Sequence, residues 1–320
     1  MAGKRIAWVD AAKGVAMLAV IVGHTAVVPT PLHEAAISFH IPLFFMLAGY
    51  TFKPRGVAEV ARKSVTRLLV PWLMLSLVAL LPHCTDPSAD GVRLIAKALF
   101  YNLSWSDSTT VHFVGMSWFL LALFIARIML AAVLALKERA GLGRLGEGVA
   151  AVVALLGGAW LARRIGPMCP LNLTAATVGM GFMLVGHLYA TIDPDELPAP
   201  RRALPRMLVA AVAWALCVRY SGIDMGVNQY VEVWPLGIAG AIAAAYLICS
   251  LCRLAENAIP QVMRPLNFTG RHSMTIYTIH AVDSAIPWGT LSLFSGAATP
   301  WLVVLLLRIA VVMGIAASLV

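Results

Sequence analysis

The sequence predicts an all-α integral membrane protein with about ten transmembrane helices and both termini in the cytoplasm. Of its 320 residues, 60% are hydrophobic and only 12% are charged, and the mean hydropathy is +0.84. Soluble domains carry about 25% charged residues. The apolar residues form long segments without the alternation of membrane strands, which disfavours an outer-membrane barrel. These observations together predict a bundle of membrane helices.

Ten apolar segments are the candidate spans. Two of them, 68–83 and 207–219, are shorter than the ~17 residues that a span usually needs. The connection 84–112 is expected outside the membrane with a short interfacial helix, and 193–206 is expected to be a proline-rich cytoplasmic linker. The predicted spans lie near residues 13–30, 35–52, 68–83, 113–136, 149–166, 172–190, 207–219, 235–252, 268–285 and 299–320.

The basic residues predict an orientation with the N-terminus inside. The connections 53–67, 137–148, 191–206 and 253–267 then face the cytoplasm, and with their flanks and the N-terminal region they hold 17 of the 24 Lys and Arg residues. Cytoplasmic loops carry this excess of Lys and Arg. The net charge of +9 therefore indicates membrane topology, and we expect membrane lipids rather than nucleic acid as partners.

The motifs of several other protein classes are missing. The sequence contains neither GxxxxGK[ST] nor GxGxxG, so ATP-driven and Rossmann chemistry have no support. Cys249 and Cys252 match CxxC, but no second cysteine pair or histidine ligand lies near them in the sequence. We expect no metal site.

The stretch from Lys13 to His24 is the centre of the functional prediction. In a helix, eleven residues bring His24 to within roughly 20° of Lys13 and about 16 Å from it along the axis. A cation at the membrane surface then shares a face with an imidazole deep in the bilayer. Asp10 precedes Lys13 by one turn. An ionisable group at that depth is a functional candidate.

Two further histidines within predicted spans extend this candidate site. His40 precedes a proline that frees backbone carbonyls. Ser273, Tyr277 and His280 fall on one helical face, and Asp283 lies one turn further, where it can orient His280. A polar seam that only joins helices is the alternative interpretation.

The basic segment after the second span has two interpretations. It contains Lys53, Arg55, Arg62, Lys63 and Arg67. It is either a simple positive-inside signal or a site for a phosphorylated cytosolic donor, because guanidinium groups suit phosphate. Coenzyme A has phosphates and a long thin arm that would reach a buried base. A neutral histidine is the natural base for removing a hydroxyl proton.

Several stretches in this order resemble the acyltransferase 3 family of bacterial membrane O-acyltransferases, and most closely its fucose 4-O-acetylase-like branch. The first is Asp10-x-x-Lys13 followed by ten residues and His24, which is similar to the family's basic-residue-x10-His signature. The others are FHIPLFFMLAGYTFK at 39–53, RKSVTRLLVPW at 62–72, SWFLLALF at 117–124, NLTAATVGMGFMLVGHLY at 172–189, IDMGVNQY at 223–230 and GRHSMTIYTIH at 270–280.

The resemblance implies a single membrane acyltransferase domain over residues 1–320, in a bacterial-type cytoplasmic membrane. Such an enzyme uses cytosolic acetyl-CoA as donor and acylates a hydroxyl of a cell-surface carbohydrate or of its glycolipid precursor. His24 matches the family's essential histidine and Lys13 its basic partner. Arg62 and Arg67, with Lys63 between them, match the segment linked to acyl-CoA. We expect no extracytoplasmic esterase-like domain in this chain.

The remaining roles follow from this hypothesis. We expect His24 to act with Lys13 and Asp10 in catalysis, and His280 and Tyr277 to shape or polarise the centre. Lys13 is also expected to bind the donor phosphates, together with the segment of Arg62, Lys63 and Arg67. His40, Asp224 and Asn228 are the candidates for binding the acceptor. Direct transfer and an acetyl-histidine intermediate both remain open.

Two functions from other classes are the alternatives. The first is a secondary transporter or exporter of a small acid, an acyl group or an amino acid, although we find no convincing repeat in the sequence. The second is a membrane module that only scaffolds partner enzymes, which would not explain the histidines. The acceptor and the oligomeric state cannot be read from the sequence.

Overall fold

The computed structural model describes residues 5–80, 114–166, 169–192, 200–231, 233–284, 286, 288 and 300–320. The expected external connection 84–112 lies outside the described residues. The chain divides into two compact units, and each is taken by itself below. The first comprises Met1–Phe44, Asp195–Gly222 and Leu236–Val320, and the second comprises Phe45–Pro194 and Ile223–Pro235.

The described chain is almost entirely helical, as the sequence predicts for an all-α membrane protein. A short antiparallel hairpin of β1 (Ile223–Asp224) and β2 (Gln229–Tyr230) is the exception within the described part. Seven helical stretches among the described residues are long and apolar enough to cross a membrane. They are Thr30–Tyr50, Ser117–Arg139, Arg144–Ile165, Pro170–Ile192, Ala203–Tyr220, Trp234–Ala258 and Trp301–Leu319. The total of ten spans and the cytoplasmic position of both termini stay predictions.

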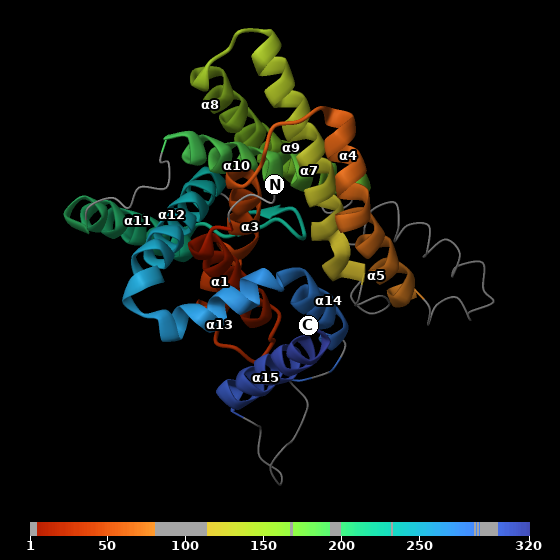
Figure 1. The fold of residues 1–320 in the computed structure, drawn as a ribbon, viewed down its shortest axis with the longest axis vertical. Helices are drawn as coiled ribbons and strands as arrows, with labels where there is room; N and C mark the ends of the chain where they lie inside the picture. Colours follow the sequence, from red (N-terminus) through yellow and green to blue (C-terminus); the bar gives the residue numbers. More distant parts are fainter. Residues whose placement is uncertain are drawn as a thin grey trace. The chain divides into compact units, whose positions relative to one another are not determined.

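The first unit is organised around α1 (Ala7–Gly23), which contacts α2, α13, α14 and α15 (Figure 1). The apolar residues of α1 are buried nearly all round, which is typical of a helix enclosed by others. The other elements of the unit are α2 (Thr30–Ile37), the first half of α3 (His40–Tyr50), α11 (Pro200–Tyr220), α12 (Trp234–Ala258), α13 (Pro260–Arg271), α14 (Ser273–Asp283) and α15 (Trp301–Leu319).

A pair of glycines lets α1 and α13 cross in close contact. A Cβ added at Gly14 would meet the backbone oxygen of Leu266, and one added at Gly270 would meet the backbone oxygen of Asp10. Small residues at such crossings let helix backbones approach closely, which is how membrane helices gain packing energy without a hydrophobic driving force. Figure 1 shows α13 running across α1.

Two predicted spans end or break earlier than the sequence suggests. The span predicted at 13–30 is helical only to Gly23, with His24 as the capping residue of α1. The segment predicted as one span at 268–285 is divided at His272 into α13 and α14. Hydropathy does not register the first change, since the residues after Gly23 remain largely apolar, whereas the second falls at the polar residues Arg271, His272 and Ser273.

Two predicted connections are partly helical. The described part of the linker predicted at 193–206 is the start of α11, which begins at Pro200. The loop predicted at 253–267 consists mostly of the end of α12 and the start of α13. Both α11 and α13 begin with proline, which fits the first turn of a helix because its missing N–H has no partner to lose there.

The second unit centres on α10 (Leu173–Ile192) and α7 (Val114–Arg139), which pack together. Against α7 lies a continuous helical segment formed by α4 (Val57–Ser64), the π-helical η1 (Val65–Leu69) and α5 (Val70–Leu80) (Figure 1). The elements packed on α10 are α8 (Arg144–Val152), the π-helical η3 (Val153–Gly157) and α9 (Gly158–Ile165), and the 3-10 turn η4 (Pro170–Asn172) precedes it.

The second half of α3 crosses α10 through another glycine pair. A Cβ at Gly49 would meet the backbone of Met183, and one at Gly186 would meet the backbone of Met46. Each unit therefore contains one helix crossing in which glycine from both helices is required by the approach of the backbones.

We predict that Gly270→Ala lowers stability by about 1–3 kcal/mol, because the new methyl group meets backbone atoms that cannot rotate away. Gly148→Ala is the matched control. It lies in helix α8 with nothing within 4 Å of its added Cβ, so it should be neutral or stabilising by about 0.5–1 kcal/mol. Thermal unfolding of both variants in the same detergent checks this, and equal midpoints would contradict the close crossing.

Candidate functional site

The C-terminal end of α1 is closed by side chains. His24 is its capping residue, and its Nδ1 donates to the backbone oxygen of Val20 at 2.8 Å. Thr25 Oγ1 donates to the backbone oxygen of Ile21 at 2.7 Å. The last carbonyls of any helix lack partners within the helix, and in an apolar environment each one must find another donor. The Thr25 hydroxyl supplies such a donor to Ile21, whereas the oxygen of Val20 accepts both the ring N–H and the backbone N–H of His24.

The bond to Val20 determines which nitrogen of His24 is available for chemistry. A carbonyl oxygen only accepts, so Nδ1 carries the proton in the neutral ring. Nε2 then bears the free lone pair, which is the form that a general base needs. His24 is exposed, whereas the two histidines beside it are buried. The accessible member of the group is therefore the one that the sequence places at the centre of the site.

The structure brings three histidines from α1, α3 and α14 together. The ring centroid of His24 lies 5.5 Å from that of His280 and 6.3 Å from that of His40. His40 Nδ1 donates to the backbone oxygen of Ala36 at 2.8 Å, and His280 Nδ1 donates to Asp283 Oδ2 at 3.2 Å. In the neutral state, all three rings thus use Nδ1 as donor and keep Nε2 as acceptor.

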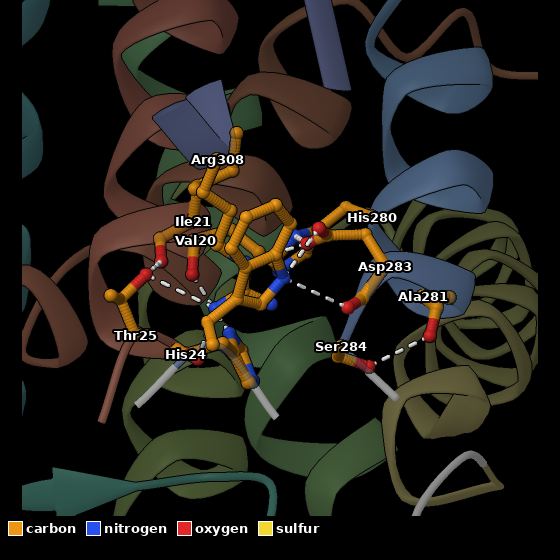
Figure 2. A network of polar contacts seen from close by, with 10 residues as sticks. Val20, Ile21, His24, Thr25, His280, Ala281, Asp283, Ser284 and Arg308 are labelled. Atoms are coloured by element: carbon orange, nitrogen blue, oxygen red, sulfur yellow. Dashed lines mark hydrogen bonds and ion pairs between the residues drawn. The ribbon is translucent and has the colours of Figure 1, made fainter. Parts of the chain in front are cut away.

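Arg308 joins this group to the end of α1, as Figure 2 shows. Its Nη1 donates to the backbone oxygen of His24 and, at 3.1 Å, to Thr25 Oγ1, while its Nε donates to Asp283 Oδ2 at 2.6 Å. Arg308 is only 2% exposed. Trp288 Nε1 donates to the other oxygen of Asp283 at 2.8 Å. The carboxylate therefore accepts hydrogen bonds from Arg308, Trp288 and His280, and the last of these orients the His280 ring.

Sequence reasoning placed Arg308 within a span but did not assign it to the site. It did place Asp283 one turn beyond His280, and the hydrogen bond between the two is present. Asp283 and Arg308 are opposite charges in two different apolar segments, and charges at membrane depth commonly pair with each other. This was the signal that could have predicted their contact. Trp288 gave no comparable signal.

Two buried atoms of the site have no hydrogen-bond partner among the described residues. The first is Nε2 of His280, which is an acceptor in the neutral ring, and the second is Nη2 of Arg308, which is a donor. Buried polar groups are normally paired with protein or water. Their presence next to His24 marks a place where a polar ligand or a water is expected.

At the other end of α1, Lys13 and Asp10 are close as the sequence predicts. Lys13 Nζ lies 3.9 Å from Asp10 Oδ1, and Arg5 Nε donates to Asp10 Oδ2 at 2.7 Å. Asp10 is buried and the Lys13 side chain is 29% exposed. One carboxylate thus serves two cations. Tyr277, the remaining residue assigned to the centre, is buried in α14.

The basic segment of the second unit is only partly free to bind a ligand. Arg55 and Lys63 both donate to Glu59, at 2.5 and 2.6 Å. The hydrogen bonds from Lys63 and then from Arg55 lower the pKa of Glu59 to about 2, so this carboxylate stays charged at physiological pH. Among the described residues, no ion pair involves Arg62 or Arg67. These two exposed guanidinium groups and the exposed Lys53, which also forms no ion pair among the described residues, are the available cations of the segment.

The hairpin residues assigned to the acceptor have structural contacts. Asn228 is buried, adopts a positive φ of 53°, accepts a hydrogen bond from Thr174 Oγ1 at 3.0 Å and donates to the backbone oxygen of Gly166. Asp224 Oδ1 accepts from the backbone N–H of Gly226 at 2.8 Å. These bonds shape the turn of the hairpin and tie it to α10. A role in binding the acceptor stays a prediction for both residues.

We predict that Arg308→Met destabilises the protein by about 3–5 kcal/mol, because it leaves Asp283 as a buried charge without its main partner. The double variant Arg308→Met with Asp283→Asn should recover part of the loss, since an amide is cheaper to bury than an unpaired carboxylate. The measurement is a double-mutant cycle, which compares the unfolding midpoints of wild type, both single variants and the double variant. Simple addition of the two single effects would contradict the coupling.

The comparisons with known proteins agree with this arrangement. Residues 6–320 match the family model Acyl_transf_3, described as an acyltransferase domain. No curated protein and no solved structure matches the chain. Because the family model covers essentially the whole chain, the protein belongs to the acyltransferase 3 family and is a membrane acyltransferase.

Proposed function

We propose that this enzyme transfers an acetyl group from cytosolic acetyl-CoA to a hydroxyl of a cell-surface carbohydrate or of its lipid-linked precursor. We further propose that it does so in a bacterial cytoplasmic membrane, as a relative of the fucose 4-O-acetylases. The observation that carries the proposal is the hydrogen bond from His24 Nδ1 to Val20, which leaves Nε2 as an accessible base.

In the proposed reaction, Nε2 of His24 takes the proton of the acceptor hydroxyl. The hydroxyl oxygen attacks the thioester carbonyl carbon, and the C–S bond breaks as the new ester forms. The thiolate of CoA then takes the proton from His24, so the base is regenerated. Charge that develops on the carbonyl oxygen needs a donor in the site. Direct transfer uses His24 once; an acetyl-histidine intermediate would use it as nucleophile.

Other residues are assigned supporting roles in this proposal. Arg62, Lys63 and Arg67 contribute positive charge for the donor phosphates, with Arg62 and Arg67 free of ion pairs in the described part of the chain. Lys13 and Asp10, which lie close together near the start of α1, are assigned to catalysis together with His24. His280 and Tyr277 shape the centre, His280 being oriented by Asp283. His40, Asp224 and Asn228 are the candidates for the acceptor.

We predict that His24→Ala abolishes acyl transfer, because removal of a general base alone typically costs about 10²–10⁴ in rate. The measurement is the release of free CoA from acetyl-CoA by purified protein in nanodiscs, with a glycan extract as acceptor. His187→Gln is the matched control: it changes a histidine of the other unit but keeps a donor for its partner Glu147. This control should release CoA at the wild-type rate.

Full activity of His24→Ala at normal protein levels would refute the assignment of the base. If the wild type releases no CoA with any extract and binds no acetyl-CoA, the donor and reaction proposed here are wrong. Release that is independent of the extract would indicate hydrolysis instead of transfer to a carbohydrate.

A further inference from the structure

Arg127 is a half-buried cation inside the apolar helix α7, at the point where α7 packs against α4 and η1. Its Nε donates to Ser64 Oγ at 3.2 Å, and its guanidinium carbon lies 5.5 Å from the ring centroid of Phe52. Ser64 is the last residue of α4 and lies three residues before Arg67 of η1, so Arg127 contacts this segment about one turn from Arg67. Two arginines from different helices thus lie near the same part of the segment.

This arrangement lacks a compensating negative charge. In the described part of the chain, no carboxylate forms an ion pair with Arg67 or Arg127. A like charge near the half-buried Arg127 is costly, and a shared anion removes that cost. Arg67 also lies in a π-helical turn, and such turns are rare and frequent at functional sites. The π turn gives Arg67 a direction that a regular α-helix would not.

A cavity of about 440 Å³ lies further along α7, between this helix and the residues just before α4. Its lining from α7 includes Ala131, Leu134 and Glu138, all within about 40° of the direction of Arg127 on a helix of 100° per residue. The opposite side is formed by the residues before α4, including Arg55 and Gly56. Leu134 is about 10 Å from Arg127 along the axis, a separation that a ribose and two phosphates can bridge.

We propose that this face of α7 binds the nucleotide end of the acyl donor, with the diphosphate between Arg67 and Arg127 and the base in the cavity. The proposal rests on the proposed function, since it places a part of the CoA molecule, and it adds Arg127, which neither the sequence motifs nor the histidine site identifies. The cavity is lined by Glu138 as well as by Arg55 and Arg139, and Arg55 is paired with Glu59. No acid pairs with Arg67 or Arg127 among the described residues, so the diphosphate is assigned to these two arginines. The apolar side chains of Ala131 and Leu134 suit a flat ring.

A lipid headgroup offers the same phosphate chemistry. The cavity favours the nucleotide, because its volume is within the range of pockets that enclose small molecules. A headgroup would use the arginine pair and leave the cavity without a role. The two sources differ in one measurable way: only the nucleotide needs both the arginine pair and the cavity.

The test is the dissociation constant of CoA, measured by calorimetry with the full-length protein in phosphatidylcholine nanodiscs. We expect Arg127→Gln and Arg67→Gln each to weaken CoA by about tenfold or more, since charge-assisted bonds to phosphate are lost. Pantetheine, which lacks the nucleotide, should bind all these proteins equally. Ala135→Trp, which fills the cavity, should weaken CoA as well.

Two matched variants control for general effects. Arg163→Gln removes the same charge near the end of α9, and Ala132→Trp adds the same bulk to the exposed opposite face of α7. Both should bind CoA like the wild type. Unchanged CoA binding in Arg127→Gln overturns the proposal. The proposal is also overturned if Arg127→Gln binds CoA normally and loses only the binding of anionic phosphatidylglycerol, since that result would identify a headgroup site. Wild-type protein that binds no CoA at all would instead refute the proposed function itself.

Discussion

The structure of the first unit depends on how α1 ends inside an apolar environment. The carbonyls of its last turn need donors that lipid cannot provide. Thr25 supplies one to Ile21, and the His24 ring adds a second donor to Val20 beside the backbone N–H of His24. Arg308 donates to the backbone oxygen of His24 from α15, at the other end of the chain. The termination of one helix therefore brings an imidazole, a buried ion pair and a second histidine to the same place.

This constraint has a chemical consequence. The ring bond from His24 to Val20 fixes the protonated nitrogen of His24, so a contact at the end of the helix prepares the proposed base. Asp283 plays a corresponding part for His280 while it neutralises Arg308. Stability and chemistry are thus supported by the same few contacts, and changes in one are expected to affect the other.

The second unit presents its charges differently. Arg55 and Lys63 are balanced by Glu59, whereas Arg67 and Arg127 lie near the same part of the segment without an acid in the described residues. The balanced pairs stabilise α4, and the unbalanced pair offers a site for an anion. The positive-inside pattern does not separate these roles, because Arg55, Lys63 and Arg67 contribute to it equally.

The sequence by itself determined the membrane class and the placement of Lys13 and His24 on one short segment, because hydropathy and helical spacing are local properties. It also indicated that Asp283 follows His280 by one turn. It did not determine that α1 stops at Gly23, that a break at His272 separates α13 from α14, or that Arg308 contacts the end of α1 and Asp283. Those features depend on partners far apart in the chain. Arg308 meets the backbone of His24 across 284 positions, and no local pattern records such a contact. Only the tertiary structure decided which polar groups inside the apolar helices would satisfy one another.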